Sequence, residues 1–202
     1  MNTRGTWQKE LAVHFQDAGL RHIPVDFGYV ILGALRPGKT NHVADEIVQA
    51  YQNHRINGIT TQHVVAHSFG TLSTARALEV HPDMCLKRII FFGSILPRDF
   101  PWSAIVNTGQ VQTVLNETCP RDPWPKRAGF WIPRAGTSGC CSFNPNTNVV
   151  ERSYGFTEHS GLATALHCDE TWIPFLLSGK TPAERITARC SRRWRRCPAG
   201  RA

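Results

Sequence analysis

Apolar positions along the chain follow two periodicities, one typical of helices and one typical of buried strands. Trp7, Leu11 and Phe15 recur at helical spacing, whereas Ile89–Phe92 is a continuous apolar run. Such runs are typical of strands that are buried on both faces of a parallel sheet. The pattern predicts helices over residues 7–18, 42–53, 72–79 and within 161–177, and strands over residues 23–32, 62–66, 88–92, 111–115 and 149–156. Asn41 is expected to be the N-cap of the helix over residues 42–53.

The order of these elements predicts a fold class. Strands separated by helical patterns favour crossover connections, which make neighbouring strands parallel. We therefore expect an α/β fold with a mostly parallel central sheet flanked by helices. The chain has 202 residues, of which 41% are hydrophobic, and residues 1–180 suit one domain with a sizeable core. Residues 120–148, rich in Pro, Gly, Cys and Asn, predict a long irregular excursion.

The positive charge is concentrated at the C-terminus. The net charge is +8, and seven Arg but no Asp or Glu lie from Arg185 onward, which leaves 16 Lys and Arg against 15 Asp and Glu elsewhere. A surface that binds nucleic acid is expected on the folded domain rather than in one terminal run. We interpret residues 181–202 as a basic, disordered tail and expect no nucleic-acid partner, while the oligomeric state stays open.

Neither a membrane span nor a secretory leader is visible. Apolar runs fall well short of roughly 18 residues, and Met1–Gln8 is polar. The seven Cys include no C-x-x-C pair, so we expect a cytoplasmic protein whose thiols serve mainly in packing. We expect no metal and no organic cofactor: a metal cluster of Cys140, Cys141, His159, His167 and Cys168 is conceivable, but these residues lack H-E-x-x-H or paired C-x-x-C spacing.

The chemistry of the chain is indicated by the segment Ala66–Gly70. It follows a predicted strand, precedes a predicted helix, and matches the pattern G-x-S-x-G with Ala in the first place. Small residues allow the tight turn that exposes a nucleophilic Ser, here Ser68, and the N–H of Phe69 would donate to an oxyanion. The simpler interpretation of Ser68 is a helix N-cap. His67 is expected to point away from the site and to be a structural residue.

A nucleophilic Ser needs a base that is itself held by an acid. In this fold the chain order is Ser, acid, His, each placed after a strand. Asp122 follows the strand 111–115, and His159 follows the last strand, so the sequence predicts a triad of Ser68, Asp122 and His159. Asp99 and Glu117 remain alternatives for the acid.

These residues resemble a known family. The segment Ala66–Thr71, the strand RIIFFGSILP, the stretch NET…RDPWP and EHSGLAT…WIPFL are similar to bacterial α/β-hydrolase-fold esterases and lipase-like proteins of poorly defined substrate. The resemblance covers about residues 4–178. It implies a serine hydrolase that cleaves a small-molecule carboxylic ester, a class that includes lipid-like esters, through an acyl-enzyme on Ser68. On that view, the aromatic residues Trp124, Phe130 and Trp131 form part of an acyl pocket or lid, or else pack at the surface.

The resemblance also implies a missing part. Such proteins carry a second oxyanion-hole motif, of the type His-Gly, at the end of a third strand that lies centrally in the sheet. Met1–Trp7 looks like the loop beyond that motif. We therefore expect an N-terminally truncated fold in which Phe69 is the remaining donor. A non-catalytic or inactive hydrolase-like scaffold is accordingly the main alternative function.

A competing motif lies at Gly33–Thr40. It matches the phosphate-binding pattern G-x-x-x-x-G-K-[ST] and stands between an apolar segment and a helix. Pro37 removes a backbone N–H from a loop that would have to bind phosphate through such groups, and the chain has no convincing strand that ends in Asp for Mg²⁺. We favour an ordinary Pro-Gly turn before a helix.

Overall fold

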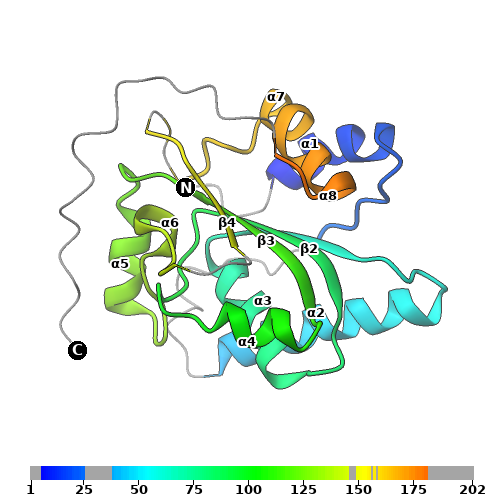
Figure 1. Ribbon diagram of the computed structural model, residues 1–202, viewed down its shortest axis with the longest axis horizontal. Coiled ribbons are helices and arrows are strands. Elements are labelled where there is room, and N and C mark those ends of the chain that lie inside the picture. The colour runs from blue at the N-terminus through cyan, green and yellow to red at the C-terminus, as the bar shows by residue number, and fades with distance from the viewer. Residues whose placement is uncertain (1–5, 26–37, 146–148, 156, 158, 182–202) are drawn as a thin grey trace.

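Four parallel strands form the centre of the structure, in the order β1-β2-β3-β4 (Figure 1). The computed structural model describes residues 6–25, 38–145, 149–155, 157 and 159–181. All three strand pairs are parallel, which confirms the predicted α/β class. The strands are β1 (His63–His67), β2 (Leu86–Phe92), β3 (Val111–Thr118) and β4 (Val149–Ser153).

Helices cover both faces of this sheet, in two layers that Figure 1 shows on opposite sides of the strands. One layer packs its apolar residues with one face of β2 and the other layer with the opposite face. The first consists of α2 (Lys39–Ile56), α3 (Phe69–Val80) and α4 (Trp102–Asn107), and the second of α1 (Thr6–Asp17), α7 (Ala165–His167), the π-helical turn η1 (Cys168–Trp172) and α8 (Ile173–Ser178).

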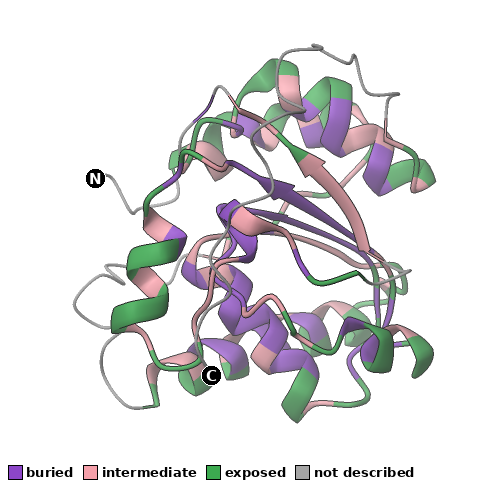
Figure 2. Cartoon of the chain, turned by 60° about the vertical axis from the view of Figure 1, so that its left-hand side comes forward, coloured by how far each residue is buried: buried purple, intermediate pink, exposed green. Residues whose placement is uncertain are grey.

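The sequence of β2 explains why both layers are needed. Ile89 and Phe91 belong to the core on the side of α2 and α3, whereas Ile90 and Phe92 belong to the core on the side of α1 and α8. All four side chains are fully buried, and the purple strands in the centre of Figure 2 show this burial. Successive side chains of a strand point to opposite faces, so a continuous apolar run requires cover on both.

Several elements differ from the sequence prediction. The segment 120–148 contains two helices, α5 (Trp124–Trp131) and α6 (Ser138–Cys141), rather than only irregular chain. The short helix α4 was not predicted. Helix α2 begins at Lys39, with Gly38 at its N-cap, because Gly38 adopts the left-handed conformation (φ 83°). Asn41 is therefore not the N-cap; its side chain accepts a hydrogen bond from Arg76 (2.9 Å).

Other expectations can be compared only in part. Most of the predicted strand 23–32 and all of the tail 182–202 lie outside the described residues, and residues 23–25 are not in a strand. Within the described ranges, β1 is an edge strand. The third strand that the resemblance implies would lie beside β1, the strand that leads to Ser68. In the same part of the chain, none of the helices is long and apolar enough to cross a bilayer.

The fold predicts which substitution is most damaging to stability. Phe91 is fully buried and contacts Trp102, with ring centroids 5.6 Å apart. We expect Phe91→Ala to lower the free energy of unfolding by about 3–5 kcal/mol, a large part of the usual total. Urea denaturation measures this, with Val13→Ala as control because Val13 is 52% exposed on α1. Equal effects of the two substitutions would contradict the described core.

Candidate active site

Ser68 stands on a sharp turn between β1 and α3. Its backbone has φ 52° and ψ −120°, a conformation that costs a non-Gly residue on the order of 1–3 kcal/mol. The turn is held by Thr71, whose N–H and hydroxyl both donate to the carbonyl of Ser68 (3.0 and 2.6 Å). A Cβ at Gly70 would lie 3.8 Å from Cβ of Ala66, an ordinary contact, so Ala fits the first position of the motif. The turn thus has the strand-turn-helix geometry of a nucleophile elbow.

Helix α3 begins at Phe69, directly after this turn. The first N–H groups of a helix have no acceptor within the helix, and they lie at the positive end of its dipole. The N–H of Phe69 is therefore placed to stabilise negative charge next to the hydroxyl of Ser68.

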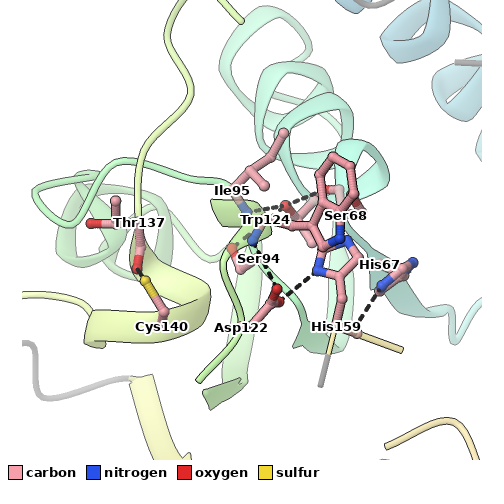
Figure 3. A network of polar contacts seen from close by, with 10 residues as sticks. His67, Ser68, Ser94, Ile95, Asp122, Trp124, Thr137, Cys140 and His159 are labelled. Carbon is pink, nitrogen blue, oxygen red and sulfur yellow. Dashed lines mark hydrogen bonds and ion pairs between the residues drawn. The ribbon is translucent and has the colours of Figure 1, made fainter. Parts of the chain in front are cut away.

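Asp122 and His159 form a short hydrogen-bonded pair beside this turn. Nδ1 of His159 lies 2.6 Å from Oδ2 of Asp122, which is fully buried, and the His159 side chain is 12% exposed. The other carboxylate oxygen of Asp122 accepts from the N–H of Trp124 (2.9 Å). Because a carboxylate can only accept, Nδ1 of His159 carries the proton and Nε2 faces the opposite way. In the view of Figure 3 the imidazole lies between Asp122 and Ser68.

The two alternative acids have other surroundings. Asp99 is exposed in the loop after β2. Glu117 is fully buried and is bound by His167 (2.9 Å), Trp172 (2.7 Å) and Tyr154 (3.2 Å). The structure thus pairs His159 with Asp122, as the sequence predicted, and assigns Glu117 to a second His–carboxylate pair.

Gly93 provides the surface on which His159 rests. It follows β2 with φ 55°, and a Cβ built on it would lie 2.9 Å from the carbonyl oxygen of His159 and 3.0 Å from Nδ1. Only Gly combines this backbone conformation with so close an approach. The sequence analysis missed Gly93, although a Gly directly after a buried parallel strand, at the same level as the elbow, is a usable signal.

His67 was expected to point away from the site and to be structural; the expected direction is wrong, whereas its hydrogen bond is to the backbone of His159. Its ring centroid is 4.5 Å from that of His159, and its Nε2 donates to the carbonyl oxygen of His159 (3.0 Å; Figure 3). Burial, followed by the nearby charge of His159, lowers the pKa of His67 to about 3. A neutral His67 therefore supports the backbone of His159 without placing a positive charge beside its imidazole.

The chain returns from α5 to the site through residues 136–139. The N–H groups of Gly136, Ser138 and Gly139 donate to the carbonyls of Ile95, Leu96 and Ser94 (2.7, 3.1 and 2.8 Å). A Cβ on Gly139 would lie 2.4 Å from the Ser94 backbone. The Gly139 carbonyl in turn accepts from the N–H of Cys119 (2.8 Å), whose own carbonyl accepts from Asp122. This segment therefore fixes both the loop after β2 and the turn that carries Asp122.

The aromatic residues of α5 have different surroundings. Trp124, at the start of the helix, lies 6.2 Å from His159 between ring centroids and is half-buried. Phe130 and Trp131, at its end, are 81% and 66% exposed. The two end residues therefore do not enclose a pocket, and only Trp124 borders the site.

The phosphate-binding motif receives little support. Residues 33–37 lie outside the described chain. Gly38 and Thr40 line a cavity of about 190 Å³ together with Arg76, Glu79 and Arg134. Arg76 and Arg134 both contact the carboxylate of Glu79 (3.1 and 2.8 Å). The positive charge that these residues bring to the cavity is therefore already paired with Glu79.

The metal cluster conceivable from Cys140, Cys141, His159, His167 and Cys168 does not assemble in the described residues, where no three His, Cys, Asp or Glu side chains gather as possible metal ligands. His159 and His167 are held by different carboxylates. Burial raises the pKa of Cys119 and of Cys168 to about 12, so neither thiol competes as a nucleophile near neutral pH.

Comparison with known proteins gives no relative. No protein-family model matches the sequence, and no curated protein and no solved structure matches it significantly.

The environment of His67 predicts an acid-dependent loss of stability. Because its folded pKa is lowered from 6.5 to about 3, stability is complete above pH 6.5 and falls as the pH drops from there towards 3. Between pH 7 and pH 5 this group contributes a loss of about 2 kcal/mol. Urea denaturation at both pH values checks this, since His67→Gln should lose less stability than the parent. Parallel losses in the two proteins would contradict a neutral, buried His67.

Gly93 predicts a local displacement of His159. Gly93→Ala should push the imidazole away from Asp122, because the new Cβ and the ring cannot share the space. The expected result is loss or a marked shift of the downfield NMR signal of the His159 Nδ1 proton in a protein that stays folded. Gly109→Ala is the control, since Gly109 also has a positive φ (80°) but open space around it. An unchanged signal in Gly93→Ala would contradict the close packing.

Proposed function

We propose that this chain is a serine hydrolase that transfers the acyl group of a carboxylic ester to water through an acyl-enzyme on Ser68. The observation that carries the proposal is the Asp122–His159 pair, at 2.6 Å, beside a Ser held in a strained elbow. Strain of this kind is concentrated at functional sites, because a surface Ser gains nothing from it. A helix N-cap explains Ser68 less well, since its side chain makes no capping hydrogen bond.

Each residue then has a defined role in acylation. Nε2 of His159 takes the proton of Ser68 as its oxygen attacks the ester carbonyl carbon, and Asp122 stabilises the imidazolium that results. The tetrahedral oxyanion accepts from the N–H of Phe69. When the intermediate collapses, His159 returns the proton to the alcohol, which leaves.

Deacylation repeats the same steps with water. His159 removes a proton from water as its oxygen attacks the acyl carbon, and Ser68 regains a proton when the carboxylic acid departs. Every proton passes through Nε2, so the reaction depends on the tautomer that Asp122 imposes. The packing of His159 on Gly93 and its contact with His67 support that orientation.

Hydrolysis of a short-chain p-nitrophenyl ester tests the proposal. Ser68→Ala and His159→Gln should each reduce kcat by on the order of 10⁴–10⁶-fold, and Asp122→Asn by about 10⁴-fold, because the three residues act as one unit. Lys39→Ala should leave activity unchanged if the Gly33–Thr40 motif is a turn. A fluorophosphonate reagent should label Ser68 in the parent and not in Ser68→Ala.

Two outcomes would overturn the proposal. Loss of activity in Lys39→Ala alone would favour the phosphate-binding interpretation. A folded parent protein that neither hydrolyses the ester nor reacts with the fluorophosphonate would favour a non-catalytic scaffold.

A further inference from the structure

Helix α5 presents an unusual outer face. Phe130 and Trp131 are among the most exposed large apolar side chains of the described residues, and their rings contact each other edge to face (5.2 Å). Figure 1 shows α5 at the periphery, on the side of the molecule away from α1 and α8. Two adjoining aromatic residues in water are unfavourable unless something covers them.

The charge around these aromatic residues is positive. Lys126 and Arg127 are exposed and precede Phe130 and Trp131 by four residues, so each basic residue lies one turn from an aromatic one on the same side of the helix. Arg121, just before the helix, is also exposed. The only acidic residue between Arg121 and Trp131 is Asp122, which is fully buried against His159. Arg127 also lies over the ring of Trp124, 5.4 Å from its centroid. The face therefore combines exposed aromatic residues with basic residues.

This combination matches an anionic lipid surface. Exposed Trp and Phe residues insert at the boundary of headgroups and acyl chains, while Lys and Arg contact anionic headgroups. We propose that Phe130, Trp131, Lys126 and Arg127 form a docking surface for an anionic lipid–water interface. The purpose of this docking surface rests on the proposed function. The surface adds to that function by naming the substrate class, an ester presented at the lipid–water interface.

The position of the helix links docking to catalysis. Trp124, at the other end of α5, borders His159, and the seven-residue step from Trp124 to Trp131 corresponds to about 10 Å of helix. An ester that enters from the interface would therefore meet Ser68 and His159 after a short path along α5.

Vesicle sedimentation with the full chain tests the docking surface. The Ser68→Ala background is used, so that hydrolysis cannot alter the lipid. We expect binding to phosphatidylglycerol–phosphatidylcholine vesicles that weakens with salt, and little binding to phosphatidylcholine alone. Phe130→Ala/Trp131→Ala should weaken binding about tenfold or more, and Lys126→Glu/Arg127→Glu about fivefold per residue. Phe130→Leu/Trp131→Phe should retain most of the affinity.

Matched controls separate this surface from other sites. Ile56→Ala and Lys87→Glu remove an exposed apolar residue and an exposed cation elsewhere and should not change binding. The series is repeated with Arg192, Arg193, Arg195 and Arg196 changed to Gln, since the tail is also basic. Binding that disappears with the tail arginines but resists the α5 substitutions would overturn the proposal. So would self-association that Phe130→Ala/Trp131→Ala abolishes, because the face would then bind a second copy of the chain.

The docking surface and the proposed function fail in different ways. Vesicle binding through α5 without ester hydrolysis would leave the surface and overturn the hydrolase. Hydrolysis of a soluble ester without vesicle binding would support the hydrolase and overturn the docking surface. If both hold, the α5 aromatic substitutions should lower turnover of an ester embedded in vesicles at least tenfold more than turnover of the soluble ester.

Discussion

The register of the parallel strands determines where the residues of the candidate site lie relative to one another. His67, Phe92 and Glu117 lie side by side on β1, β2 and β3, because these strands pair with that alignment. The residues that follow them in sequence therefore leave the sheet at one level: Ser68 after β1, Gly93 after β2 and the turn to Asp122 after β3. Backbone hydrogen bonds alone thus bring together side chains that are far apart in sequence. A shift of one strand by one residue would separate Ser68 from the surface on which His159 rests.

The carboxyl edge of this sheet holds two His–carboxylate pairs. Asp122 binds His159, and Glu117 binds His167. Glu117 also accepts from Tyr154 and Trp172, so it fixes chain segments both before and after His159. A buried carboxylate is tolerated only when hydrogen bonds replace the lost water, and these three donors meet that requirement. The loop that carries His159 is therefore held at both ends by one fully buried side chain.

Much of this arrangement could be predicted from the sequence, and the predictions that were wrong have identifiable physical reasons. The apolar run of β2 and the elbow around Ser68 are local signals, so the α/β class and the candidate nucleophile could be predicted. Strand order favoured Asp122 as the partner of His159 but left Asp99 and Glu117 open, because all three lie near the ends of strands and the choice depends on tertiary contacts. His67 was misjudged because its role depends on a contact with a residue 92 positions away. Helix α2 was predicted too short because a Gly in the left-handed conformation, rather than Asn41, begins it. Helices α5 and α6 were not predicted, because their Pro and Gly residues give the segment a low intrinsic helix propensity. Tertiary contacts stabilise the two helices despite that low propensity.

The attachment of residues 136–139 has an evolutionary consequence. The excursion that contains α5 is anchored at Asp122 on one side and by the Gly136–Gly139 backbone on the other, and these anchors are main-chain or buried contacts. The part of the helix beyond Trp124 can therefore change while the contact of Trp124 with Asp122 and the Asp122–His159 pair stay in place. The outer end of α5 and the candidate site thus depend on separate stretches of chain, so substitutions can accumulate at that end without rebuilding the sheet.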